Sequence, residues 1–76
     1  MQIKIKLSSP EDINIFSKII NHFPFDVDII SKRTYIDAKS VLGLYSINLN
    51  EPFTLDIHAE EDDCTELLAK LIDYVE

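Results

Sequence analysis

The chain has very few of the residues that often reveal a function at once. It contains a single cysteine, Cys64, so no disulfide can form within it. A small domain that folds without disulfides fits a reducing compartment, and we expect a cytoplasmic protein. Cys64 falls on the apolar stripe of the last predicted helix, where a buried structural thiol is the expected role.

Long apolar runs and excess basic charge are also missing. The N-terminal residues "MQIKIKLSS" lack the apolar centre of a signal peptide, and no apolar run is long enough to span a bilayer. Seven Lys and Arg stand against fourteen Asp and Glu, which gives a net charge of −7. This charge repels phosphate backbones and anionic lipids, so we expect protein partners and neither nucleic acid nor membrane.

Catalytic and metal-binding patterns are missing as well. One cysteine and two distant histidines cannot make a recognisable zinc site, and the acidic residues 60–63 lack calcium-loop spacing. No nucleophile–histidine arrangement can be read from the spacing. The sequence therefore predicts no cofactor, no metal and no enzymatic activity.

Four stretches alternate apolar and polar residues, which is typical of half-buried strands. They are residues 1–7, 25–30, 34–38 and 53–59, and the second and third are expected to form a hairpin. Their predicted inward residues are Ile3, Ile5, Leu7, Phe25, Val27, Ile29, Ile36, Ala38, Phe53, Leu55 and Ile57.

Helical patterns fill the remaining segments. The first predicted helix begins near Ser9, a candidate N-cap, with Pro10 in its first turn and Asp12 completing a capping box. Pro24 ends this helix. Its predicted buried stripe is Ile13, Phe16, Ile20 and Phe23, with Ile19 beside it. Residues 60–76 read as one amphipathic helix whose apolar stripe is Cys64, Leu67, Leu68, Leu71 and Val75.

A short third helix is predicted from Ser40 onward, in "DAKSVLGLYS". The single glycine, Gly43, costs such a helix about 1 kcal/mol relative to alanine. Its apolar residues are too many to face inward together, so the segment is either core or an exposed docking patch. Ser40 either caps the helix only, or caps it and also has a regulatory role.

The element order β-α-β-β-α-β-α predicts a single α+β domain over residues 1–76. We expect an open-faced β-sandwich: a mostly antiparallel four-stranded sheet with three helices on one face.

Two segments resemble HPr, the phosphocarrier family of the bacterial sugar phosphotransferase system. "KSVLGLYSI" is similar to the family's regulatory-serine motif, and "AEEDDCTELLAKL" to the acidic lead-in of its last helix. The likeness runs from residue 25 to the C-terminus. It implies a four-stranded sheet covered by three helices, with a phosphoryl-accepting histidine at the start of the first helix, followed by arginine and proline.

The chain departs from the family at that histidine. The corresponding residues "SSPEDIN" contain no histidine and no arginine, and Glu11 is nearest the expected position. His22 and His58 lie elsewhere in the chain. Histidyl phosphocarrier activity is therefore not expected.

The resemblance instead directs attention to the serine motif. It implies that Ser40 is a regulatory phosphorylation site for a serine kinase, and that Lys39, Val41, Leu42 and Tyr45 bind partner proteins. We predict a non-catalytic regulatory domain that binds phosphotransferase-system or regulatory proteins. The alternatives are a phosphocarrier with an unusual acceptor and an interaction domain with an unrelated partner.

Overall fold

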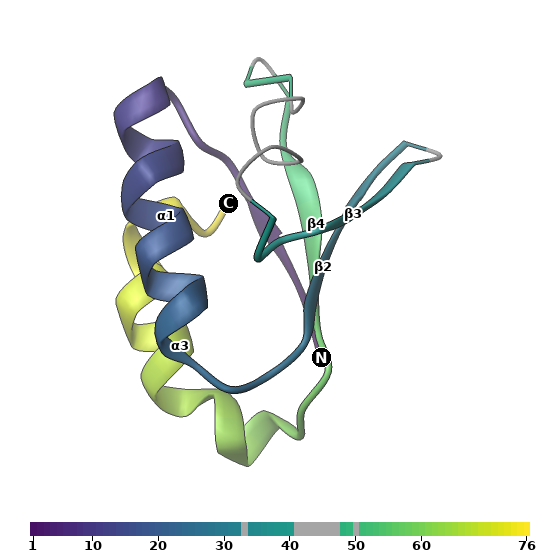
Figure 1. The fold of residues 1–76 in the computed structure, drawn as a ribbon, viewed down its shortest axis with the longest axis vertical. Helices are drawn as coiled ribbons and strands as arrows, with labels where there is room; N and C mark the ends of the chain where they lie inside the picture. Colours follow the sequence, from purple (N-terminus) through teal and green to yellow (C-terminus); the bar gives the residue numbers. More distant parts are fainter. Residues whose placement is uncertain (33, 41–47, 50) are drawn as a thin grey trace.

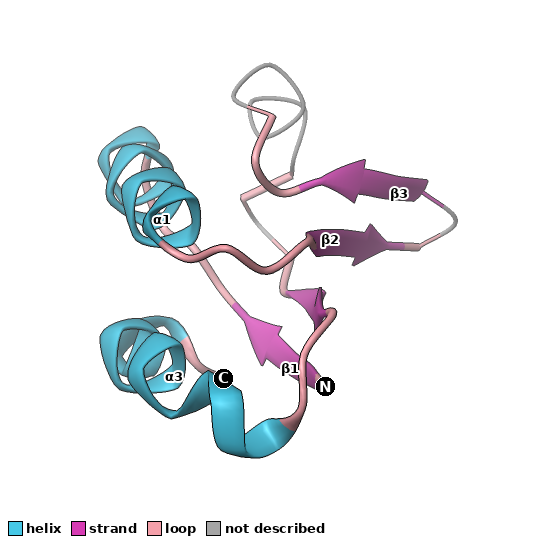
Figure 2. Ribbon diagram, turned by 60° about the horizontal axis from the view of Figure 1, so that its bottom comes forward, coloured by secondary structure: helices cyan, strands magenta, loops and turns pink. Residues whose placement is uncertain are grey.

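The computed structural model describes residues 1–32, 34–40, 48–49 and 51–76. They contain a four-stranded sheet in the order β1-β4-β2-β3, and all neighbouring strands are antiparallel. The strands are β1 (Gln2–Ile5), β2 (Val27–Ser31), β3 (Thr34–Asp37) and β4 (Phe53–Ile57). Helices α1 (Pro10–His22) and α3 (Thr65–Leu71) lie side by side over one face of the sheet (Figures 1 and 2).

This arrangement confirms the predicted α+β fold with an open antiparallel sheet. The predicted hairpin is also confirmed, because β2 pairs with β3 and Ser31 lies opposite Thr34. At its tip, Lys32 has a φ of 53°, the left-handed conformation that a tight hairpin turn demands. Of the three predicted helices the structure describes two, and the short helix expected from Ser40 falls on residues 41–47, outside the described residues.

The strand register gives the sheet two different faces. Ile3, Leu55, Ile29 and Ile36 lie opposite one another across β1, β4, β2 and β3, and their row faces the helices. Because side chains alternate along a strand, the neighbouring row faces away from the helices. That row is Gln2, Asp56, Asp28 and Asp37.

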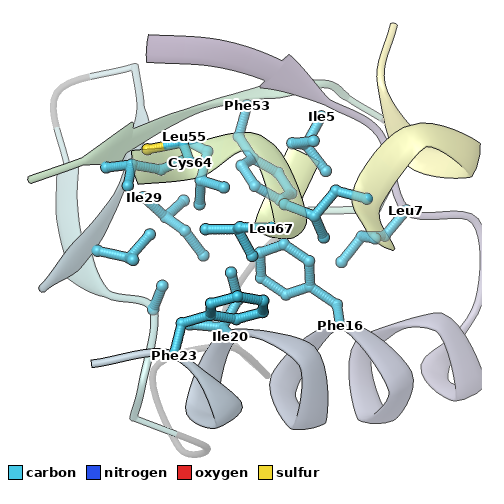
Figure 3. Packing of buried hydrophobic residues seen from close by; sticks show 14 of the residues in the cluster. Ile5, Leu7, Phe16, Ile20, Phe23, Ile29, Phe53, Leu55, Cys64 and Leu67 are labelled. Atoms are coloured by element: carbon cyan, nitrogen blue, oxygen red, sulfur yellow. The ribbon is translucent and has the colours of Figure 1, made fainter. Parts of the chain in front are cut away.

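The core lies between the sheet and the two helices. Figure 3 shows side chains from α1 and from the strands pointing toward one another. Phe16 of α1 meets Phe53 of β4 edge to face, with ring centroids 5.9 Å apart. The buried apolar residues are Ile5, Leu7, Ile13, Phe16, Ile20, Phe23, Val27, Ile29, Ala38, Phe53, Leu55, Ile57, Cys64, Leu67 and Leu71.

The prediction of one continuous helix over residues 60–76 is wrong. The chain forms a 3₁₀ helix η1 (Glu61–Cys64), then α3, then a second 3₁₀ helix η2 (Ile72–Tyr74). Val75 is 41% exposed instead of buried, and its backbone forms a β-bridge with Ile5. The helix ends because the last residues run along the edge of β1, where Lys6 N–H donates to the Tyr74 carbonyl at 2.9 Å.

Candidate functional site

Ser40 is placed by a turn that directly follows β3. The Ser40 N–H donates to the carbonyl oxygen of Asp37 at 3.0 Å, and the Lys39 N–H donates to Asp37 Oδ1 at 2.9 Å. A short acidic side chain that accepts from the backbone two residues later is typical of such turns. Ser40 itself is exposed to solvent.

Lys39 attaches this turn to the first helix. Its Nζ donates to the carbonyl oxygen of Phe23 at 2.8 Å, across sixteen residues of sequence. Phe23 is the C-cap of α1, where carbonyl oxygens lack partners within the helix and favour a cation. The predicted partner-binding residue Lys39 therefore has a structural contact that its place in the sequence did not reveal.

The rest of the predicted partner-binding patch cannot be placed. Val41, Leu42 and Tyr45 lie outside the described residues, so whether they form a docking surface stays a prediction.

The N-terminus of α1 contains the capping residues that the sequence predicted. Ser9 Oγ accepts from the Asp12 N–H at 3.3 Å, and Asp12 Oδ2 accepts from the Ser8 N–H at 2.9 Å. Pro10 occupies the first turn, together with the acidic Glu11 and Asp12. Two carboxylates thus stand where free N–H groups of a helix would attract an anion such as a phosphoryl group.

Neither histidine lies at that end of α1. His22 is the last residue of the helix, about 18 Å along the axis from Pro10 at 1.5 Å per residue. His58 follows β4, and its Nε2 lies 2.9 Å from Asp28 Oδ2 and 3.7 Å from Asp56 Oδ2. His58 therefore belongs to the acidic row on the open face of the sheet.

Two further groups have shifted ionisation. Burial raises the pKa of the Cys64 thiol, which suits the inert structural thiol predicted from the sequence. Burial, followed by the negative charges of Asp12 and Asp73, raises the pKa of the Tyr74 phenol. No described segment brings together three side chains able to hold a metal ion.

The match to a family model decides the relationship. Residues 13–76 match the model described as the PTS HPr component phosphorylation site. The chain belongs to the HPr family. The matched range begins at Ile13, directly after the capping residues of α1.

Solved structures show the same fold. The chain is similar to the phosphocarrier protein HPr from Bacillus anthracis, at 24% identity and a TM-score of 0.75, covering 100% of this chain and 96% of that one. It is also similar to HPr-C-His from Thermoanaerobacter tengcongensis, at 19% identity and a TM-score of 0.72, covering 96% and 85%.

A third similar structure is Crh of Bacillus subtilis, a catabolite repression protein whose crystals contain an intertwined dimer with a swapped domain. Its identity is 24%, its TM-score 0.64, and the coverage 97% of this chain and 88% of that one. A search of curated protein sequences finds no match. Among the residues that the structure describes, no helix is long and apolar enough to cross a membrane.

Proposed function

We propose that this HPr-family chain is a regulatory protein-binding domain and does not carry phosphoryl groups on a histidine. The proposal places partner binding on Lys39, Val41, Leu42 and Tyr45, and regulation on phosphorylation of Ser40. Its partners would be phosphotransferase-system or regulatory proteins. The similar structure of Crh, a catabolite repression protein, favours a role in carbon catabolite regulation.

The observation that carries the proposal is the composition of the α1 N-terminus. Ser9 and Asp12 use their side chains to cap the helix, and no residue from 8 to 12 is a histidine or an arginine. A phosphoryl group bound there would meet Glu11 and Asp12 instead of a bidentate arginine donor. The family match also begins only at residue 13, after this segment.

The Ser40 turn supports the regulatory part of the proposal. A phosphate on Ser40 would add roughly two negative charges beside Lys39, whose ammonium group now contacts the neutral Phe23 carbonyl at 2.8 Å. Ammonium–phosphate hydrogen bonds are stronger than those to a neutral carbonyl. Phosphorylation would therefore draw Lys39 away from α1 and change the surface beside the predicted docking patch.

The first test uses phosphoenolpyruvate and the general phosphotransferase enzyme. We expect no acid-labile phosphate on this protein, while an HPr with its histidine is labelled in the same reaction. Acid-labile labelling that is lost in His22→Ala or His58→Ala would instead identify a phosphocarrier with an unusual acceptor.

The second test uses ATP and the serine kinase of the family. We expect one acid-stable phosphate on the wild type and on Ser46→Ala, and none on Ser40→Ala. Labelling that survives in Ser40→Ala would remove Ser40 from the proposal.

The docking patch is tested with purified proteins that bind members of the HPr family. They are captured either by the immobilised wild type or by immobilised Leu42→Asp. Capture should be weaker for the variant, because a charge within an apolar contact must lose its water. Ile72→Asp, at an exposed apolar residue of η2, serves as the matched control. Equal capture by wild type and Leu42→Asp would remove the patch.

A further inference from the structure

A small pocket lies between α1 and α3. Its lining residues are Lys18, Ile19 and His22 from α1 and Lys70 from α3, and its volume is about 230 Å³. Three of the four lining side chains are basic, and the fourth is apolar. In a chain of net charge −7, this concentration of basic groups needs an explanation.

Three other lysines of the chain each contact a protein oxygen. Lys6 donates to the Leu49 carbonyl at 3.0 Å, Lys39 to the Phe23 carbonyl at 2.8 Å, and Lys32 pairs with Glu51 at 3.4 Å. Within the described part of the chain, Lys18 and Lys70 form no ion pair within 4.0 Å. This holds although the sequence contains fourteen acidic residues.

Helix electrostatics account for only part of the arrangement, since His22 and Lys70 lie in the last turns of α1 and α3, where a basic group favours the helix dipole, whereas Lys18 lies four residues before the end of α1. Cations near the C-terminus of α1 would stabilise its dipole, but Lys39 already contacts the Phe23 carbonyl there. Lys70 belongs to the other helix, and Glu66, four residues earlier, is not within ion-pair distance of it in the described structure. The side chains of Lys18 and Lys70 thus line one pocket without an ion-paired carboxylate in the described structure, an arrangement that a bound anion would stabilise.

We infer that this pocket binds a small organic phosphate. Two ammonium groups supply positive charge and hydrogen-bond donors for a dianionic group, the imidazole supplies a further hydrogen-bonding group, and Ile19 supplies an apolar contact for the carbon substituent. The volume lies below the roughly 300–1,000 Å³ of pockets for drug-sized ligands, so the ligand is compact. The site does not involve Ser40 or the α1 N-terminus, so the test of phosphate binding is independent of the proposed function.

The probes are phenyl phosphate, inorganic phosphate and phenylacetate, each titrated into ¹⁵N-labelled protein at constant ionic strength. We expect saturable shifts of the Lys18–His22 and Lys70 amides with phenyl phosphate. Inorganic phosphate should bind more weakly because it lacks a group to contact Ile19, and phenylacetate because it carries one charge. Equal affinity for any two of the three probes would overturn the assignment to an organic phosphate.

The double variant Lys18→Gln/Lys70→Gln should bind phenyl phosphate at least about tenfold more weakly, since two charge-assisted contacts are lost. The matched control is Lys4→Gln/Lys32→Gln, which lowers the net charge equally outside the pocket and should change the affinity less than twofold. The two-dimensional spectra of the unbound variants establish that both are folded. Equal weakening in both variants, or shifts that do not saturate, would mean only general attraction between the protein and anions and would overturn the proposal.

Discussion

The Lys39 ammonium donates a hydrogen bond to the carbonyl oxygen of Phe23 at 2.8 Å, which joins the turn before Ser40 to the C-terminal end of α1. The turn that precedes Ser40 is therefore hydrogen-bonded to the end of α1, sixteen residues earlier in the sequence. A hydrogen bond from a charged donor contributes about 1.5–3 kcal/mol when it is shielded from water. Since Lys39 is partly buried, its contribution should lie at the lower end.

We expect Lys39→Met to lower the free energy of unfolding by about 1.5 kcal/mol, because it removes the ammonium group and keeps most of the side-chain length. Urea denaturation measures this change. The matched control is Lys32→Met, which removes only an exposed ion pair to Glu51 and should cost less than about 0.5 kcal/mol. If the two variants lose equal stability, the Phe23 contact has no special weight.

The open face of the sheet contains the like-charged row Asp56, Asp28 and Asp37, whose members lie opposite one another on adjacent strands. Opposed like charges are destabilising by a few tenths of a kcal/mol. We expect Asp56→Asn to raise the free energy of unfolding by up to about 0.5 kcal/mol at low salt and by less at 1 M NaCl, where charges are screened. Asp28 keeps its 2.9 Å contact with His58 in this variant, and only the longer 3.7 Å approach of His58 to Asp56 loses its carboxylate.

Asp26→Asn is the matched control for the acidic row, because it removes the same charge just outside β2. It should change stability less than Asp56→Asn does. A gain that is the same for both variants would reflect only the lower net charge of the chain.

The sequence predicts well the features that depend on residues close to one another along the chain. The alternation of Phe53, Leu55 and Ile57 places all three side chains in the core, and Ser9 with Asp12 caps α1 as expected. These features follow from a two-residue period and from contacts within four residues, so they can be read locally.

The features that the sequence did not predict depend on distant contacts. The helical spacing that includes Val75 is interrupted after Leu71, because the last residues pair with the edge of β1 instead. Neither the Lys39–Phe23 contact nor the pocket lined by Lys18 and Lys70 has a local signal, since each involves two separate elements. Comparing the lysines with the predicted helix ends could have suggested a C-terminal cap for α1, but not which lysine provides it.

The raised pKa of Tyr74 predicts a loss of stability at alkaline pH. The folded protein holds the phenolic proton to a higher pH than the unfolded chain, whose tyrosine has an ordinary pKa near 10.0. Above that pH the folded state binds more protons than the unfolded state, so the free energy of unfolding falls as pH rises. The effect of Cys64 has the same sign and begins near its ordinary pKa of 9.0.

Tyr74→Phe should therefore lose less stability than the wild type between about pH 9 and 11, as measured by urea denaturation across that range. Tyr35→Phe is the matched control, because Tyr35 is 71% exposed, and it should follow the pH dependence of the wild type. If Tyr74→Phe and wild type decline in parallel, burial of the Tyr74 phenol does not contribute to the alkaline loss.

The pairing of the C-terminal residues with β1 can be tested through a single backbone donor. The Glu76 N–H donates to the Lys4 carbonyl at 3.0 Å, next to the bridge between Ile5 and Val75. Glu76→Pro removes this donor, while proline still favours the extended conformation that Val75 already has, with φ −70° and ψ 128°. We expect a loss of about 0.5–1 kcal/mol and faster hydrogen exchange at Lys6, whose N–H donates to the Tyr74 carbonyl. Glu76→Ala keeps the donor and should retain the exchange rate of the wild type, so equal rates for the proline and alanine variants would show that this segment does not protect the edge of β1.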